Sequence, residues 1–122
     1  MMTKKMLITA GELEISSLLN NTETAQAFAK TLPRTITMKG SLDREFYGYI
    51  DEQLPLVDQQ VTKVKDGDIV FWIKGNGIAV FYDTSVKPTL GSPMIIIGEM
   101  QKSFRALAEM KAEVQMTFSL LD

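Results

Sequence analysis

Cysteine and histidine are both absent from the 122 residues of this chain. Without cysteine there is no disulfide, no thiolate nucleophile and no ligand for an iron–sulfur cluster. Without histidine the chain lacks the usual base of serine and cysteine hydrolases and the commonest protein ligand of zinc and copper. No serine is followed three positions later by lysine, so the Ser-x-x-Lys pattern is missing too. The sequence therefore argues against a hydrolase and leaves only an oxygen-ligated Mg²⁺ or Ca²⁺ site open.

An excess of basic charge and long apolar runs are also missing. Lysine and arginine together number 13 against 15 acidic residues, for a formal net charge of −2. The basic residues lie in small separate groups, whereas nucleic-acid-binding domains carry a clustered basic patch. No apolar run reaches about 18 residues, and residues 6–10 are too few for the core of a signal peptide. We therefore expect no nucleic-acid partner, no membrane partner and a cytoplasmic location.

What remains is an ordinary globular composition, with 45% hydrophobic and 23% charged residues. The length suits one domain, and the chain contains no repeat, low-complexity tract or linker. We predict a single domain over residues 1–122. The eight methionines are dispersed along the chain and are interpreted as core residues.

Periodicity predicts mostly strands. Residues 6–10 and 12–18 form two candidate strands around a turn at Ala10-Gly11, and in the second of them apolar and polar residues alternate. A helix is predicted over residues 22–32, capped near Thr22, with Ala25, Phe28 and Ala29 on its apolar face and Pro33 after its end.

The strongest local signal is a hairpin around Gly75-Asn76-Gly77. Two apolar runs, residues 69–73 and 78–82, flank it, and Asn-Gly favours a tight hairpin turn. Both runs are apolar on both faces, which indicates central strands of a closed or doubly covered sheet.

The rest of the chain divides into further short elements. Strands are expected at residues 35–39, 44–50, 94–98 and 113–121, loops at 51–64 and 84–93, and a second short helix at 103–110 with Ser103 as its cap. These elements predict a mainly-β barrel with two short α-helices.

Several charged or glycine-rich segments have simple structural interpretations. Gly75-Asn76-Gly77 lies between strands, so it cannot form a phosphate-binding loop at a helix start. Asp66-Gly67-Asp68 lacks the later ligands of a calcium loop and is interpreted as a turn. The acidic pairs Asp43/Glu45 and Asp51/Glu52 are interpreted as solvated surface. No metal and no cofactor are therefore expected.

Aromatic residues concentrate in the segments around positions 46–49 and 71–82. Most of them are expected in the core, but strands that are apolar on both faces cannot hide every ring. Trp72 points to the opposite side from Phe71, and we hypothesise an aromatic groove for a small ligand or peptide. The candidate ligand-binding residues are Arg44, Phe46, Tyr47, Trp72 and Phe81.

Three segments in order resemble the small bacterial cyclophilin-like domains, over about residues 5–120. They are Thr24-Ala25-Gln26-Ala27-Phe28 before Leu32-Pro33, the hairpin Gly67–Trp72 with Gly77–Tyr82, and Ile96-Ile97-Gly98-Glu99-Met100 before a short helix. The resemblance implies a closed eight-stranded β-barrel with a helix at each end. It also raises the question of prolyl cis–trans isomerase activity, which needs neither cysteine nor histidine.

Against the pattern of the isomerases, three positions differ. Ala79 stands where the resemblance places a glutamine that holds the substrate backbone, although Phe81 keeps the aromatic position. No arginine lies within Phe46-Tyr47-Gly48-Tyr49, and Arg44 at its edge is the nearest substitute. The loop of the central hairpin is shortened to Gly75-Asn76-Gly77, which removes a wall of the peptide groove.

The leading hypothesis is a barrel that binds a small molecule or peptide without isomerase activity and without a catalytic residue. The alternative is a weak peptidyl-prolyl cis–trans isomerase that uses Phe81 and Arg44. A third hypothesis is assembly between protomers, through an apolar face of the barrel or through a free edge at residues 113–121. The oligomeric state, monomer or homodimer, is left open.

Overall fold

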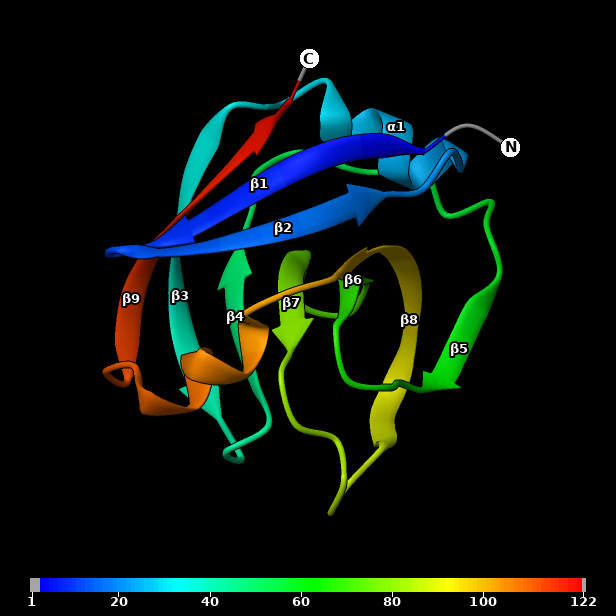
Figure 1. Cartoon of the computed structure of the whole chain (residues 1–122). Coiled ribbons are helices and arrows are strands. Elements are labelled where there is room, and N and C mark those ends of the chain that lie inside the picture. The colour runs from blue at the N-terminus through cyan, green and yellow to red at the C-terminus, as the bar shows by residue number, and fades with distance from the viewer. Residues whose placement is uncertain (1–2, 122) are drawn as a thin grey trace.

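The computed structural model describes residues 3–121, which form nine β-strands, a short α-helix and a 3-10 helix (Figure 1). In chain order they are β1 (Lys4–Ala10), β2 (Leu13–Leu19), α1 (Glu23–Ala29), β3 (Arg34–Ser41), β4 (Glu45–Tyr49), β5 (Gln60–Lys63), β6 (Asp68–Trp72), β7 (Gly77–Phe81), β8 (Thr89–Met100), η1 (Phe104–Glu109) and β9 (Glu113–Leu120). Within the described residues no helix is long and apolar enough to cross a membrane.

Eight of the strands close into an antiparallel barrel. Their order around the barrel is β2-β1-β9-β3-β4-β7-β6-β8, and β8 pairs with β2 through Ser17↔Met100 and Leu19↔Gly98 to complete the ring. The ninth strand, β5, pairs with the first half of β8, between Thr89 and Ile95. The closed eight-stranded barrel with two short helices is thus confirmed.

Local sequence explains the first hairpin and the helix. Gly11 adopts φ of +61° in the turn between β1 and β2, a conformation that glycine adopts without steric cost. Thr22 caps α1, because its hydroxyl accepts a hydrogen bond from the N–H of Ala25 at 3.4 Å. The helix ends at Ala29, three residues before the predicted end, because Thr31 and Leu32 close tighter i→i−3 turns on Phe28 and Ala29.

The central hairpin is confirmed, but its turn is longer than the Asn-Gly pattern suggests. Trp72 pairs directly with Gly77, so residues 73–76 form a four-residue loop. Asn76 alone takes a left-handed φ of +53°, and its side-chain amide donates to the carbonyls of Ile50 and Glu52. Gly77 already belongs to β7, where a Cβ would lie 2.4 Å from the carbonyl oxygen of Gly48.

Two predicted loops contain strand instead. Residues 51–64 end in β5, and residues 84–93 overlap the start of β8 at Thr89. Both segments lack alternation because β5 is exposed and because the β5–β8 ladder is irregular between Val61 and Lys63. Pro93 falls in this irregular stretch, where a missing N–H costs least.

The remainder of residues 51–64 closes one end of the barrel against α1. The N–H of Thr24 donates to Asp58 at 2.7 Å, and its hydroxyl donates to the carbonyl of Pro55 at 2.6 Å. The hydrogen bond from the N–H of Thr24 holds the pKa of the Asp58 carboxyl below its usual value.

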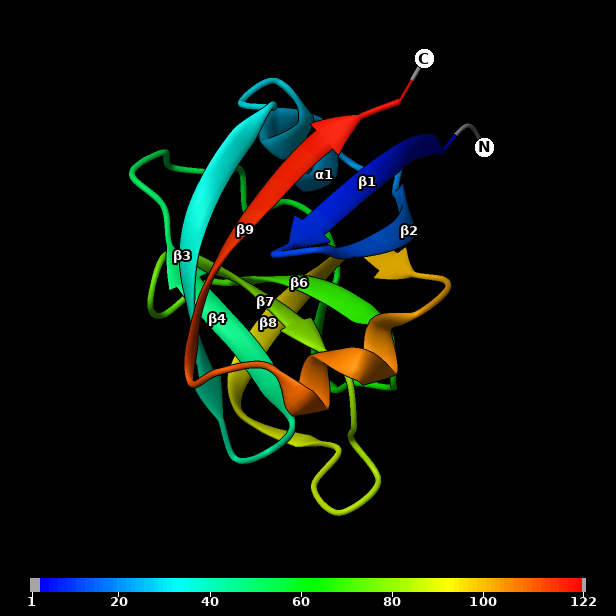
Figure 2. The same ribbon diagram turned by 60° about the vertical axis from the view of Figure 1, so that its left-hand side comes forward.

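Two further expectations are corrected near the C-terminus. Ser103 precedes η1 but makes no capping hydrogen bond with its side chain, and the helix is of the 3-10 type. Strand β9 offers no free edge for assembly, because it pairs with β1 on one side and β3 on the other (Figure 2).

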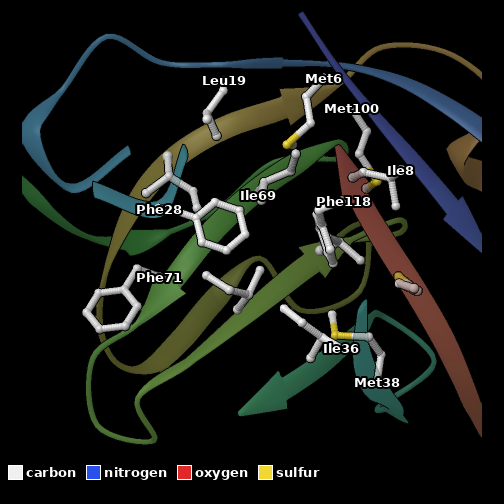
Figure 3. Packing of buried hydrophobic residues seen from close by; sticks show 14 of the residues in the cluster. Met6, Ile8, Leu19, Phe28, Ile36, Met38, Ile69, Phe71, Met100 and Phe118 are labelled. Carbon is white, nitrogen blue, oxygen red and sulfur yellow. The ribbon is translucent and has the colours of Figure 1, made fainter. Parts of the chain in front are cut away.

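Strand alternation divides the buried apolar residues into two clusters. The inner cluster fills the barrel and includes Phe28, Phe71 and Phe118, with the rings of Phe28 and Phe118 edge to face at 5.8 Å (Figure 3). The outer cluster lies on the opposite face of β6 and β7. Its buried members are Val64, Val70, Ala79, Phe81 and Met94, and its partly buried members are Tyr47, Trp72, Leu90 and Ile96.

Candidate functional site

A cleft of about 460 Å³ opens on the outer face of the barrel, above the outer cluster. It combines apolar surface with hydroxyl and charged groups, the usual character of small-ligand sites. Its lining residues are Ser41, Arg44, Glu45, Tyr47, Trp72, Lys74, Ala79, Gly91, Ser92 and Met94.

The register of three neighbouring strands produces this hollow. One row across the sheet is Tyr49 on β4, Gly77 on β7 and Trp72 on β6. The next row places Ala79 on β7 directly beside Tyr47 on β4. Because β7 carries small residues in these two rows where its neighbours carry large ones, the large side chains meet as one wall and Ala79 forms the floor beside it.

The aromatic wall is held in place by mutual contacts. The ring of Trp72 lies 5.4 Å from Tyr47, edge to face, and 5.8 Å from Tyr49, tilted. Gly75 lies against the indole, since a Cβ on Gly75 would come within 2.4 Å of its ring atoms. Edge-to-face packing of this kind restrains the rings, so the wall is formed before any ligand binds.

Arg44 forms the polar end of the cleft and is itself buried. Its Nε donates to Oε1 of Glu45 at 2.5 Å, and its Nη1 donates to the carbonyls of Lys87 and Thr89 at 3.0 and 3.1 Å. The guanidinium carbon lies 5.1 Å from the ring centroid of Phe81, within the range of a cation–π contact. Arg44 thereby fastens the β7–β8 loop over Phe81.

A second anchor fixes the beginning of that loop. Asp66 accepts hydrogen bonds from the backbone N–H and the hydroxyl of Thr84, both at 2.7 Å, and pairs with Arg105 at 3.0 Å. The Thr84 bonds, with a smaller contribution from Arg105, hold the pKa of Asp66 below its ordinary value.

The structure brings three of the five candidate residues together in the cleft. Arg44, Tyr47 and Trp72 line it, whereas Phe81 lies fully buried beneath Arg44. Phe46 faces the barrel interior, with its ring 5.9 Å from that of Tyr82. Phe46 and Tyr47 are consecutive in a strand, so they cannot share a face.

Sequence reasoning missed several lining residues. The alternation that places Tyr47 outward also places Glu45 outward, and Lys74 directly follows the strand of Trp72 in the loop, so these two were open to prediction. Gly91, Ser92 and Met94 were not, because they reach the cleft only through the irregular part of β8. In residues 3–121 no three carboxylates gather as a metal site would require.

Comparisons with known proteins agree on the fold. The model of the Cyclophilin-like family matches residues 8–119. The solution structure of a hypothetical protein from Archaeoglobus fulgidus superimposes with a TM-score of 0.72, covering 96% of this chain and 94% of that chain at 21% identity. None of the curated proteins matches the chain.

Proposed function

The chain belongs to the cyclophilin-like family, and from this premise we propose that its barrel binds a small molecule or a short peptide without catalysing prolyl isomerisation. The proposed site is the cleft on the outer face of β4, β6 and β7. Its volume of about 460 Å³ falls within the range of sites for small organic ligands.

The observation that carries the proposal is the position of Arg44 over Phe81. A proline-binding pocket needs an accessible aromatic floor, but Phe81 is 0% exposed and the Arg44 guanidinium covers its ring. An isomerase arginine must also donate to the substrate at the twisted amide. The Nε and Nη1 donors of Arg44 are already bonded to Glu45, Lys87 and Thr89; these bonds hold the guanidinium over Phe81 and leave only Nη2 for a ligand of the cleft.

The floor of the cleft supports the same conclusion. Ala79, which replaces the glutamine expected from the isomerase pattern, has no hydrogen-bonding side chain to hold a peptide backbone. The methyl group instead leaves room beside the wall that Tyr47 and Trp72 form together. The cleft is thus shaped for occupancy by a ligand rather than for twisting a prolyl bond.

An exchange NMR experiment on the peptide Ala-Ala-Pro-Phe tests the isomerase alternative directly. We expect the cis–trans exchange rate of the prolyl bond to be the same with and without the protein. Acceleration that is abolished by both Arg44→Ala and Phe81→Ala would overturn the proposal. Cyclophilin itself serves as the positive control for the assay.

Binding is measured through Trp72, which is the only tryptophan of the chain and lines the cleft. Its indole N–H therefore gives a single cross-peak that reports on the site. We expect N-acetyl-L-phenylalanine to shift this cross-peak until the site is saturated. Ala79→Leu should abolish the shift, because the larger side chain occupies the space above residue 79 in the cleft. Ala106→Leu, at an exposed position of η1, adds the same side chain outside the lining and should leave binding intact.

A further inference from the structure

The charges that line the cleft are unequal at its two ends. One end carries Arg44 and Glu45, whose buried side chains are bound to each other. The other end carries Lys74, in the loop that follows Trp72. Among the ion pairs of residues 3–121, none includes Lys74. The cleft is therefore net positive, although the chain as a whole carries a net charge of −2.

The two ends differ in what they can recognise. The Arg44–Glu45 end presents Nη2 of Arg44, the guanidinium nitrogen that is not bonded to Glu45, Lys87 or Thr89, beside a carboxylate acceptor, and its own charges are balanced. Such a pair complements a neutral group that both donates and accepts, such as an amide. Lys74 is a compact charge with three donors on a flexible stem and complements an anion. Between the ends lie Ala79 and the aromatic wall, which complement an apolar group.

The distance between the ends is set by strand geometry. Glu45 and Tyr49 are four residues apart on β4, or roughly 13 Å at the rise of an antiparallel strand. Tyr49 shares its row with Trp72, just before the loop of Lys74. Since a lysine stem reaches several ångströms, an acylated amino acid or the last two residues of a peptide can span the gap.

We propose that the ligand of this cleft is a carboxylic acid bearing an amide and an apolar side chain, with its carboxylate bound by Lys74 and its amide by Arg44 and Glu45. This inference rests on the proposed binding function. An N-acylated amino acid and the free C-terminus of a peptide share this chemistry, and the experiment separates the two sources.

The test compares four probes through the indole cross-peak of Trp72. N-acetyl-L-phenylalanine carries all three groups, N-acetyl-L-phenylalaninamide lacks the charge, 3-phenylpropionate lacks the amide, and acetyl-Ala-Ala-Phe presents a peptide C-terminus. We expect the complete acid to bind about tenfold or more tightly than either truncated probe, as is usual for a charge-assisted hydrogen bond. Whether the tripeptide binds more or less tightly than the single amino acid identifies the source.

Matched lysine variants locate the anion contact. Lys74→Gln should remove the preference for the acid over the neutral amide. Lys4→Gln makes the same charge change on β1, the strand opposite β7 in the ring, and should keep the preference. Both lysines are exposed, so neither variant threatens folding.

The outcomes distinguish this inference from the proposed function. If the acid and the neutral amide bind equally, or Lys74→Gln leaves their ratio unchanged, the inference is wrong while the binding function stands. If 3-phenylpropionate binds as tightly as the complete acid, the assignment of the amide is wrong. If no probe shifts the Trp72 cross-peak at any concentration, both are wrong.

Discussion

The two faces of β4, β6 and β7 are built on opposite principles although the same strands supply both. The inner face carries large apolar residues at every position except Gly48, such as Phe46, Phe71 and Val80, and these large residues are fully or almost fully buried. The outer face alternates large and small residues across the strands, with Ala79 beside Tyr47, and its rim at Tyr49 is 60% exposed.

This difference assigns stability and binding to separate faces. Inside the barrel, side chains from opposite strands meet and close-pack, and any lost volume leaves a cavity. Outside, only part of the face is covered, where Arg44 lies over Phe81, and the small side chain of Ala79 lies under an open cleft rather than a closed cavity. Substitutions on adjacent residues of one strand should therefore have different consequences for stability and for binding.

Phe71→Ala should have the largest effect on stability. Phe71 is almost completely buried in the inner cluster, and its truncation should lower the free energy of unfolding by about 3–5 kcal/mol. Trp72→Ala, the next residue, should cost less than half as much because Trp72 is partly exposed, yet it should abolish binding of N-acetyl-L-phenylalanine, which is measured by calorimetry because this variant lacks the indole signal. Urea denaturation followed by far-UV circular dichroism measures the free energy of unfolding of both variants. Equal losses of this free energy in the two variants would contradict the division between the faces.

Glu45→Gln should have the next largest effect, at the polar end of the outer face. It leaves the buried Arg44 guanidinium without a carboxylate, and we expect a loss of about 2–3 kcal/mol in unfolding free energy. The matched control is Glu52→Gln, which breaks the Arg34–Glu52 pair at 2.7 Å. Glu52 is 43% exposed, so this change should cost less than about 1 kcal/mol. A similar loss in both variants would show that burial does not govern these pairs.

Acid should loosen the loop above the outer cluster before it unfolds the barrel. The pKa of Asp66 is lowered in the folded state, so its bonds to Thr84 stabilise the fold above the ordinary aspartate pKa and are lost as the pH falls through the lowered value. Asp66→Asn should weaken that acid dependence and cost about 1 kcal/mol at neutral pH. Denaturation midpoints measured between neutral pH and pH 2 check this, and an unchanged pH profile in the variant would refute it.

The smallest effect should come from a turn that serves neither face. Leu42 and Asp43, between β3 and β4, adopt φ of 58° and 50°, a left-handed conformation that is costly for leucine and easier for aspartate, asparagine and above all glycine. Leu42 is 61% exposed and adds little packing. Replacing the pair by Leu42→Asn and Asp43→Gly should raise the stability by about 1 kcal/mol and leave probe binding unchanged. A loss of binding would instead show that the turn contributes to the cleft.

Much of the fold could be predicted from local sequence signals. The Asn20-Asn21-Thr22 segment marks the start of α1, and Gly11 marks the first hairpin turn, because both depend on backbone preferences of neighbouring residues. Strand β5 and the first part of β8 were missed because they are irregular and are stabilised by pairing with each other rather than by alternation. Of the five candidate site residues, Arg44, Tyr47 and Trp72 line the cleft. Phe46 does not, because strand alternation places it on the opposite face from Tyr47.

The sequence by itself determined the fold class and the chemistry that is ruled out: alternation and turn residues encode strands locally, and the absence of cysteine and histidine is a property of composition alone. Only the tertiary structure decided where the cleft lies and what covers Phe81. The hollow depends on the register that sets Tyr47 beside Ala79, and Arg44 meets Phe81 and the carbonyl of Thr89 across more than thirty residues of chain. No local pattern reports such contacts, because they form only when the barrel closes.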